Sequence, residues 1–565
     1  MKWGPIVIFM LLASAYAVEA QDWPMFHGDP QHTGYSISEA PADNTLLWEF
    51  TTGDFIYSSP AVVNGRVYVG SKDYNLYCLD ENNGDVIWFY RTGDGVHSSP
   101  TVVDGKVYVG SNDYRIYCFN AENGELIWSY QTALEVYSSP AVVNGKVYFS
   151  SNDDNIYCLN AENGDLIWVF LTNDYVFSSP AVWNGKVYVG SNDNKVYCLD
   201  GNSGTLIWNH ETGGEVYSSP AVVDGKVYVG SYDNEIYCLN AETGDVIWSS
   251  KTGFEISSSP AVVNGKVYVG SYDWKVYCLN AETGAVIWNF PTGSSVHSSP
   301  AVANGMVYVG SYDRKIYCLN AESGALIWSY LTGNIVHSSP AVADGKIYIG
   351  SYDSKIYCFG EPDFSISINP VKGSVVQGKS ISAIVTVSII GFENVALSIE
   401  GAPSNVTVEL DPPAGGKTFT STMTISTSSN APTGKHVITI TGIGARGKVR
   451  TATYTLSIAG PYEWLISDWL LILLVIALIT LGIWAYRRKR KKKRWIPLLV
   501  PIVLIIVMIV MYVIDMVGLY ELTTLIFWLL ILLIIVILLA ILAISWGREE
   551  KREHRYLLAP ESRKR

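Results

Sequence analysis

Residues 217–250 read YSSPAVVDGKVYVGSYDNEIYCLNAETGDVIWSS, and this stretch decides the fold. Short runs of Val, Ile, Tyr and Trp alternate with turn residues, and no helical periodicity is present. The pattern predicts four antiparallel strands, which we call A to D. Strands A and B are joined by Asp224-Gly225, a pair that accepts the positive φ angles of a two-residue hairpin turn. An Asn-Gly or Asp-Gly pair stands at this point in every copy of the pattern.

The pattern returns at a fixed spacing. The eight cysteines follow one another every 40 residues, and tryptophans keep the same spacing; they stand at Cys78, Cys118, Cys158, Cys198, Cys238, Cys278, Cys318 and Cys358, and at Trp48, Trp88, Trp128, Trp168, Trp208, Trp248, Trp288 and Trp328. Four antiparallel strands in each repeat are typical of one propeller blade. The sequence therefore predicts an all-β chain with an eight-bladed β-propeller over residues 22–361.

The two ends of the repeat region predict how the ring closes. After Cys358 the chain leaves without a Trp-bearing strand, whereas a lone Trp-bearing strand at 46–50 precedes the first repeat. We predict that the Trp48 strand completes blade eight, because a closed ring hides the sheet edges that otherwise invite aggregation. The single Cys of each blade is interpreted as a small buried residue between blades, too far from its equivalents for a disulfide.

The 40-residue spacing ends at 362, and a second β region follows. Residues 362–460 contain no Cys or Trp and hold seven alternating runs; the runs are 364–368, 381–389, 395–399, 406–410, 419–425, 437–440 and 454–458. This count in a segment of this length predicts an immunoglobulin-like β-sandwich, interpreted as a spacer.

The two ends of the chain predict export and membrane insertion. Residues 1–20 resemble a signal peptide. Three apolar stretches, 465–486, 496–514 and 523–546, are each long enough to span a bilayer and are predicted to be transmembrane helices. The basic loop 487–494 and the basic tail 547–565 place those segments on the cytoplasmic side. We therefore expect a multi-pass cell-membrane protein that contacts membrane lipid and has its propeller and sandwich on the extracytoplasmic side.

The net charge of the chain restricts the class of partner that it can bind. The net charge is −13, and the acidic excess lies before residue 487. An acidic ectodomain argues against nucleic acid as a partner. The basic run 487–494 lies between two predicted spans, so a cytoplasmic loop explains it better than a nucleic-acid patch does.

One motif carries a family resemblance. The segment AETGDVIW at 241–248 resembles the tryptophan-docking motif of the pyrroloquinoline-quinone (PQQ) propeller family. The leader DWPMFHGDPQHTG at 22–34 is similar to the segment that enters such propellers in exported prokaryotic proteins, many of them archaeal. The family includes PQQ-dependent alcohol dehydrogenases and non-catalytic members. The sandwich and tail resemble modules of archaeal surface proteins, so the resemblance as a whole is to a non-catalytic, membrane-anchored surface protein of archaeal type.

The resemblance also allows the enzymatic alternative to be tested. The dehydrogenases of the family hold the quinone against two adjacent cysteines and bind Ca²⁺ through blade-specific oxygen ligands. This chain has no Cys-Cys pair, and its repeated aspartates share one turn position, where aspartate typically bonds its own turn backbone; they are Asp73, Asp113, Asp153, Asp193, Asp233, Asp273, Asp313 and Asp353. We therefore expect no catalytic residue, no PQQ with Ca²⁺ and no metal site, so that the protein is not an enzyme.

A comparison of the repeats with one another marks one variable face. The A–B and C–D connections barely vary, whereas the D–A and B–C connections vary and lie on the same face of a propeller. The candidate ligand-binding residues on this face are Tyr57, His97, Tyr137, Phe177, Tyr217, Trp274, His297, Arg314 and His337. Aromatic, His and carboxylate groups around a concave mouth suit sugars, peptides or cations. There are two alternatives for this face. Its turns vary because they tolerate substitution, or His297 and His337 hold a metal ion.

The sequence thus predicts a binding or scaffolding module at the cell surface that recognises a protein, glycan or small ligand through the D–A and B–C face. A PQQ-dependent oxidoreductase and a purely structural envelope protein are the alternatives.

Overall fold

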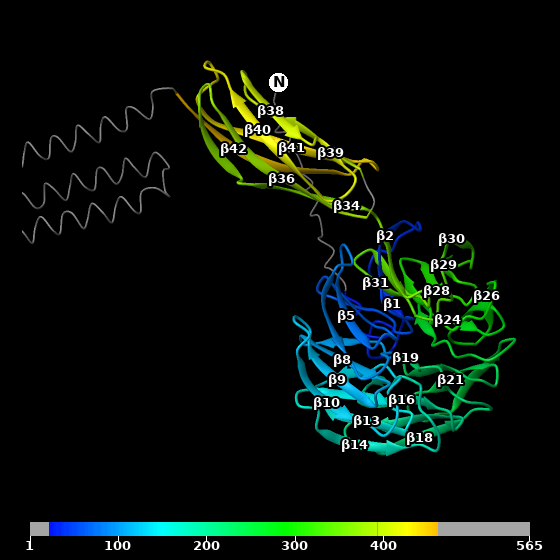
Figure 1. Ribbon diagram of the computed structural model, residues 1–565. Helices are drawn as coiled ribbons and strands as arrows, with labels where there is room; N and C mark the ends of the chain where they lie inside the picture. The colour runs from blue at the N-terminus through cyan, green and yellow to red at the C-terminus, as the bar shows by residue number, and fades with distance from the viewer. Residues whose placement is uncertain (1–21, 392–393, 461–565) are drawn as a thin grey trace, which may run out of the picture. The chain divides into compact units, whose positions relative to one another are not determined.

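The computed structural model describes residues 22–391 and 394–460, and every regular element in these ranges is a β-strand. Residues 46–360 form eight sheets of four repeated strands, arranged about a common centre in chain order (Figure 1). We number them by their innermost strands, from sheet 1 (with β3) to sheet 8 (with β31). The described chain therefore has the repeated sheets of a β-propeller.

Each sheet runs from a short inner strand to a longer outer strand. The innermost strands are β3 (Ala61–Val63), β7 (Thr101–Val103), β11 (Ala141–Val143), β15 (Ala181–Trp183), β19 (Ala221–Val223), β23 (Ala261–Val263), β27 (Ala301–Ala303) and β31 (Ala341–Ala343). The second strands are β4 (Arg66–Gly70), β8 (Lys106–Ser111), β12 (Lys146–Ser150), β16 (Lys186–Ser191), β20 (Lys226–Gly230), β24 (Lys266–Ser271), β28 (Met306–Gly310) and β32 (Lys346–Gly350).

The third strands carry the cysteines, and the outer strands carry the tryptophans. The third strands are β5 (Asn75–Asp80), β9 (Arg115–Asn120), β13 (Asn155–Asn160), β17 (Lys195–Asp200), β21 (Glu235–Asn240), β25 (Lys275–Asn280), β29 (Lys315–Asn320) and β33 (Lys355–Gly360). The outer strands are β6 (Val86–Arg91), β10 (Leu126–Gln131), β14 (Leu166–Leu171), β18 (Leu206–Glu211), β22 (Val246–Lys251), β26 (Val286–Pro291), β30 (Leu326–Leu331) and β2 (Leu46–Thr51).

Local chemistry explains the turns and the spacing of the repeat. Asn64 and Gly65 have φ angles of 51° and 74°, as the A–B hairpin requires. Gly84 in the C–D connection has a φ of 74°, and a Cβ there would lie 2.6 Å from the Trp48 ring. The indole N–H of Trp88 donates to the carbonyl of Ala121 in the next sheet at 3.0 Å. In sheets 1 to 7 the C–D glycine therefore packs against a tryptophan of the preceding sheet.

The ring closes between its first and last strands, as predicted. Strand β2 pairs antiparallel with β33, and Trp48 lies opposite Cys358. The indole N–H of Trp48 then donates to the carbonyl of Glu81 in sheet 1 at 2.9 Å. The predicted pairing of the Trp48 strand is therefore confirmed.

A closed circle of hydrogen bonds also joins the inner ends of the eight sheets around their common centre. The backbone N–H of the second serine of each Ser-Ser-Pro donates to the Oγ of its equivalent in the next sheet, at 2.9 to 3.1 Å. The circle runs through Ser59, Ser99, Ser139, Ser179, Ser219, Ser259, Ser299 and Ser339 and returns to Ser59. The inner strands are thus held to one another even though each is only three residues long.

Residues 22–38, which we call the strap, run across the inner strands beside the A–B turns. Strap carbonyl groups accept backbone N–H groups of sheets 1, 2, 4, 5, 6 and 7, namely those of Val62, Val102, Val182, Val222, Val262 and Val302. Strand β1 (Tyr35–Ser36) pairs in parallel with β27, and Ser38 Oγ accepts the N–H of Gly345 in sheet 8. Trp23, Met25, His27 and His32 of the strap are buried. The strap therefore covers the A–B end of the centre.

The predicted cysteine role is confirmed. All eight cysteines are buried and free of disulfide bonds. Burial raises the pKa of the Cys78 thiol to about 12, which leaves it a poor nucleophile at neutral pH. The cysteines therefore act as small packing residues.

Residues 363–459 form two further sheets around a core that includes Phe364, Val385, Met423, Ile438 and Tyr454. One sheet has the order β34 (Asp363–Asn369), β36 (Ser380–Ile390), β40 (Phe419–Thr427) and β38 (Val406–Asp411). The other has the order β35 (Lys372–Val376), β42 (Val449–Ala459), β41 (Gly434–Gly444), β37 (Val395–Glu400) and β39 (Ala414–Gly415). All seven predicted runs are strands, and β35 and β39 are additional because they are short and carry no clear alternation.

Within the described ranges no helix is long and apolar enough to cross a membrane. The predicted signal peptide, the three apolar stretches, the basic loop and the tail lie outside the described residues.

One ion pair between sheets is buried, and it yields a test of the closure. Lys346 Nζ lies 2.6 Å from Glu81 Oε1, and the Glu81 side chain is only 5% exposed. We expect Glu81→Gln to lower the free energy of unfolding by about 2 kcal/mol, because the change removes a buried carboxylate that pairs with Lys346 and also accepts the Tyr348 hydroxyl. The matched change is Glu162→Gln, which removes an equally short pair with Lys106 whose carboxylate is 77% exposed; it should lower that free energy by no more than about 0.5 kcal/mol. Equal effects in urea denaturation would contradict this assignment.

Candidate functional site

The D–A and B–C connections lie on one face because hydrogen bonds join them in every sheet. Asp73 Oδ2 in the B–C turn accepts the N–H of Gly53 in the preceding D–A connection and the hydroxyl of Tyr77, both at 2.7 Å. The other seven turn aspartates accept the equivalent two donors. These carboxylates are therefore parts of the turns, as the sequence predicted.

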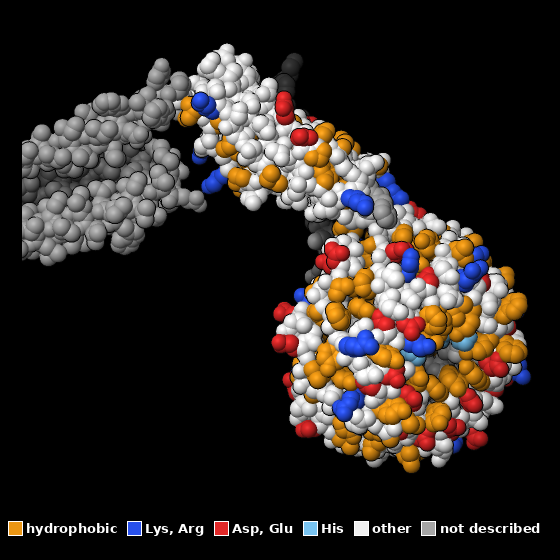
Figure 2. Space-filling view, viewed as in Figure 1, with side chains coloured by type: hydrophobic (Ala, Val, Ile, Leu, Met, Phe, Trp, Pro, Cys, Tyr) orange, Lys and Arg blue, Asp and Glu red, His pale blue; other side chains and the backbone are white. Residues whose placement is uncertain are grey.

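Residues before each Ser-Ser-Pro form a ring at the open end of the centre, which we call the mouth ring. Its members are Tyr57, His97, Tyr137, Phe177, Tyr217, Ser257, His297 and His337. Neighbouring ring centroids lie 4.2 Å apart for Tyr57 and His97, 5.0 Å for Phe177 and Tyr217, and 5.4 Å for His297 and His337. Figure 2 shows histidine atoms in pale blue beside a hollow, with orange apolar and red acidic side chains around it. The structure thus brings seven of the predicted site residues into one ring.

A tyrosine layer missed by the sequence reasoning supports half of the mouth ring. Tyr232, Tyr272, Tyr312 and Tyr352 follow the B–C serine in sheets 5 to 8, where sheets 1 to 4 carry Lys72, Asn112, Asn152 and Asn192. Tyr232 and Tyr272 bridge the gap at Ser257, since the Tyr272 hydroxyl lies 3.0 Å from that of Tyr232 and 2.8 Å from Nδ1 of His297. The sequence alone shows this difference, because four repeats have Tyr at this position and the other four have Lys or Asn.

The mouth histidines are neutral at physiological pH. Burial, together with the charge of His337, lowers the pKa of His297 to about 3. Burial also lowers the pKa of His97 and of His337 to about 4. The ring therefore carries no positive charge of its own at neutral pH, although acidic residues surround it.

A metal ion bound by His297 and His337 would need further ligands. In residues 22–391 and 394–460 no group of three His, Cys, Asp or Glu side chains could hold a metal ion. His297 Nδ1 already faces the Tyr272 hydroxyl, and Tyr312 stacks on its ring with a centroid distance of 4.0 Å. The arrangement is that of a packed aromatic cluster.

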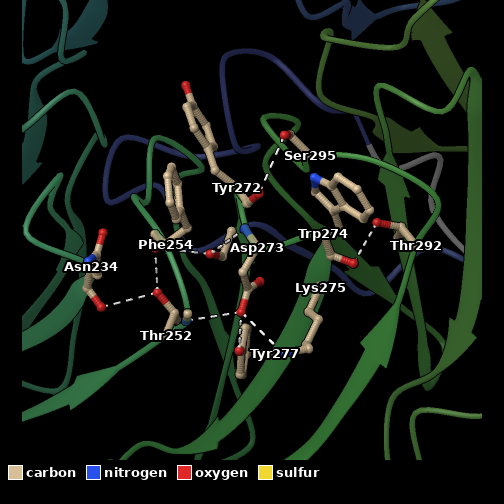
Figure 3. A network of polar contacts seen from close by, with 12 residues as sticks. Asn234, Thr252, Phe254, Tyr272, Asp273, Trp274, Lys275, Tyr277, Thr292 and Ser295 are labelled. Atoms are coloured by element: carbon tan, nitrogen blue, oxygen red, sulfur yellow. Dashed lines mark hydrogen bonds and ion pairs between the residues drawn. The ribbon is translucent and has the colours of Figure 1, made fainter.

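A cavity of about 430 Å³ lies beside the mouth ring in sheet 6. It is lined by Phe254, Tyr272, Asp273, Trp274 and Ser295, and we call it the sheet 6 pocket. In Figure 3 the side chains of Phe254, Tyr272 and Trp274 point to the same side, and the Asp273 carboxylate turns away toward Tyr277. Trp274 is the predicted site residue that lines this pocket, whereas Arg314 stands at the equivalent turn of sheet 7 and is not among the lining residues.

Several buried polar atoms of this face have no hydrogen-bond partner within the described protein. Five of them are Oδ1 of Asn112, Asn152 and Asn192, Nε2 of His97 and Oε2 of Glu255. Buried polar atoms are nearly always satisfied in folded proteins, so such groups mark places where water or a ligand group completes the network. All five belong to D–A or B–C connections or to the mouth ring.

Comparisons with known proteins agree with the fold. A family model described as the β-propeller of beta-alanine-activating enzyme matches residues 31–226, and one described as outer membrane protein assembly factor BamB matches residues 232–383. No curated protein sequence gives a significant match.

Solved structures with similar folds include an assembly factor and two dehydrogenases. BamB from Moraxella catarrhalis is 18% identical with a TM-score of 0.51, covering 56% of this chain and 100% of that chain. A europium-containing methanol dehydrogenase is 14% identical with a TM-score of 0.53, covering 60% and 98%. A quinohemoprotein alcohol dehydrogenase from Pseudomonas putida HK5 is 14% identical with a TM-score of 0.52, covering 60% and 80%. At these identities the likeness shows the fold alone. The described chain therefore carries a β-propeller, and two parts of it match the family models described for the propeller of beta-alanine-activating enzyme and for BamB.

Proposed function

We propose that this chain is a binding module that captures a protein partner at the cell surface through the face formed by its D–A and B–C connections. In this proposal the eight sheets are the blades of one propeller, residues 362–460 are an immunoglobulin-like spacer, and the C-terminal apolar stretches anchor the molecule in the cell membrane. The signal peptide and the extracytoplasmic placement belong to the same proposal.

The supporting observation is that the symmetry of the repeat breaks on this face. The Asn-Gly and Asp-Gly turns are nearly the same in all repeats, and the strap covers that end of the centre. The opposite face carries the mouth ring, the half-circle of tyrosines and the sheet 6 pocket. A ligand without eightfold symmetry requires an asymmetric site, and exposed aromatic groups are common anchors of protein interfaces.

A PQQ-dependent oxidoreductase is the second candidate, because the similar structures include a quinohemoprotein alcohol dehydrogenase and a methanol dehydrogenase. The donor groups of this chain do not suit that cofactor. The cysteines are buried one to a sheet, with no adjacent pair, and each turn aspartate is already bonded to a turn N–H and a tyrosine hydroxyl. A purely structural envelope protein is the third candidate, and the next test separates it from a binding module.

We expect Trp274→Ala combined with His297→Ala to weaken partner capture by at least about tenfold, because truncation of a true anchor typically costs about 2 kcal/mol or more. The measurement is quantitative pull-down from native membranes by the full-length chain, with thermal unfolding as the check that the variant is folded. Lys186→Gln with Lys226→Gln is the control on the A–B face, where these lysines pair with the exposed Glu242 and Glu282. Equal losses from the two faces, or none from either, would leave only a structural role.

A further inference from the structure

The sheet 6 pocket is lined by aromatic residues that no other repeat combines at the same positions. The position of Phe254 holds Asp54, Asp94, Leu134, Asp174, Gly214, Ser294 and Asn334 in the other repeats. The position of Trp274 holds Tyr74, Tyr114, Asp154, Asn194, Asn234, Arg314 and Ser354. Among the eight described repeats only sheet 6 combines aromatic groups at both positions with a tyrosine between them, at Tyr272.

These aromatic groups are exposed although the fold does not require it. Phe254 and Trp274 are 52% and 55% exposed; no other repeat has an aromatic residue at the position of Phe254, and only Tyr74 and Tyr114 are aromatic at the position of Trp274. Trp274 also has a φ of 69°, a backbone conformation unfavourable for a bulky side chain. Large exposed rings held on both sides of a cavity of this size are typical of a ligand site.

The charge around the pocket selects the ligand. The D–A connections, residues 52–57 and their equivalents every 40 residues, contain six acidic residues and no Lys or Arg; the six are Asp54, Asp94, Glu135, Asp174, Glu215 and Glu255. Glu255 directly follows Phe254 and has a buried carboxylate oxygen without a partner. The backbone N–H of Tyr272 donates to the carbonyl of Glu255 at 3.0 Å, so Glu255 lies directly beside a residue that lines the pocket.

The nearby cations are already engaged. Lys275 lies 3.4 Å from the Asp273 carboxylate and over the Tyr277 ring, and Lys251 pairs with Glu235 at 3.5 Å. His297 is neutral at physiological pH. Arg314, at the equivalent turn of sheet 7, is exposed but does not line the pocket, so none of the described lining residues supplies the positive charge that the faces of Trp274 and Phe254 and the carboxylate of Glu255 would attract.

We propose that the sheet 6 pocket binds an arginine side chain of a basic peptide segment in the partner, with the guanidinium group against the aromatic rings and its charge opposed by Glu255. This assignment rests on the proposed binding function and names the anchor of the partner. Arg is favoured over Lys because its planar, weakly hydrated cation stacks on aromatic faces.

The test is calorimetric titration of the full-length chain at about 0.15 M salt with a peptide of about six arginines and with the same peptide built from citrulline, the neutral isostere of arginine. We expect the arginine peptide to bind at least about tenfold more tightly. Phe254→Ala with Trp274→Ala should then weaken arginine-peptide binding by at least about tenfold. This double variant changes no charge, so unspecific attraction to an acidic surface would be unaffected by it.

Tyr114→Ala is the matched control, because Tyr114 occupies the turn position of Trp274 in sheet 2 with a similar φ of 69° but faces no second aromatic group from its D–A connection. We expect this variant to bind the arginine peptide within about twofold of the unaltered chain. Equal affinity for the arginine and citrulline peptides, or equal losses in the two variants, would overturn the proposed anchor.

The two proposals fail separately. If partner capture depends on Trp274 and His297 but the peptides are not distinguished, the binding face stands and the arginine anchor is wrong. If neither capture nor arginine-peptide binding responds to changes on this face, both proposals are wrong.

Discussion

Trp48→Ala is expected to lower the free energy of unfolding by about 4 kcal/mol, within the range measured for truncation of buried Trp and Phe rings. Trp48 is 6% exposed, it stands on the strand that joins the first and last parts of the ring, and its indole N–H donates to Glu81. The change opens a cavity at the closure and removes a hydrogen bond between sheets 8 and 1. Urea denaturation of the full-length chain measures the effect, and deletion of residues 44–52 should destabilise the ring further because each sheet is stabilised by its neighbours.

Trp328→Ala is the matched control for this prediction. The Trp328 ring is buried to the same degree, at 7% exposure, but its indole nitrogen has no partner because the chain leaves sheet 8 after Gly360, where the next C–D connection would begin. We expect Trp328→Ala to be less destabilising than Trp48→Ala by about 1 kcal/mol, the usual contribution of one hydrogen bond. A deletion of 44–52 that left the stability unchanged would contradict closure through this strand.

Mild acid is expected to destabilise the propeller strongly, because the strap buries two histidines in their neutral form. Burial lowers the pKa of His27 to about 3 and that of His32 to about 4, whereas both are near 6.5 in an unfolded chain. As the pH falls below about 6.5, the unfolded state takes up protons that the folded state does not. The contribution of the two neutral histidines to the free energy of unfolding is therefore fully present above pH 6.5 and is lost as the pH falls toward 4. At pH 5 each histidine is expected to reduce the free energy of unfolding by about 2 kcal/mol.

His32→Asn isolates this effect. The Nδ1 of His32 lies 3.2 Å from the carbonyl of Pro220, and the side-chain amide of Asn can supply the same donor without titrating. Asn also tolerates the φ of 58° at this position. We expect the variant to lose about 2 kcal/mol less than the unaltered chain between pH 8 and pH 5 in urea denaturation. His210→Asn, at a partly exposed position of β18, should change the pH dependence much less, and equal slopes for all three chains would refute the prediction.

Much of the propeller follows from local sequence. The Asn64-Gly65 turn, the C–D glycine Gly84 and the alternation around Cys78 each specify structure within about ten residues, and the 40-residue repeat multiplies those signals. The pairing of Trp48 with the last sheet followed from counting strands. The same reasoning found the seven longer strands after residue 362 and missed β35 and β39, which are short and lack alternation.

Part of the candidate site was also visible in the sequence. The mouth ring from Tyr57 to His337 was predicted because each member precedes an identical Ser-Ser-Pro. Tyr272 was missed, since it lies inside a turn motif, between the constant Ser271 and Asp273, where the comparison of repeats considered only the tip residue Trp274. Phe254 was missed because its neighbour in the pocket, Trp274, belongs to a different connection 20 residues later, and only the folded sheet places the two on opposite sides of one cavity.

By itself, the sequence determined the strands, their turns, the burial of the cysteines and the closure of the ring, because these depend on local preference repeated at a constant spacing. Only the tertiary structure decided the course of the strap, the burial of His27 and His32, the tyrosine layer and the sheet 6 pocket. The strap has no period, and its hydrogen bonds join residues 23–38 to residues between 62 and 345. Contacts of that separation depend on where the chain passes once all the sheets are assembled, and no local pattern encodes them.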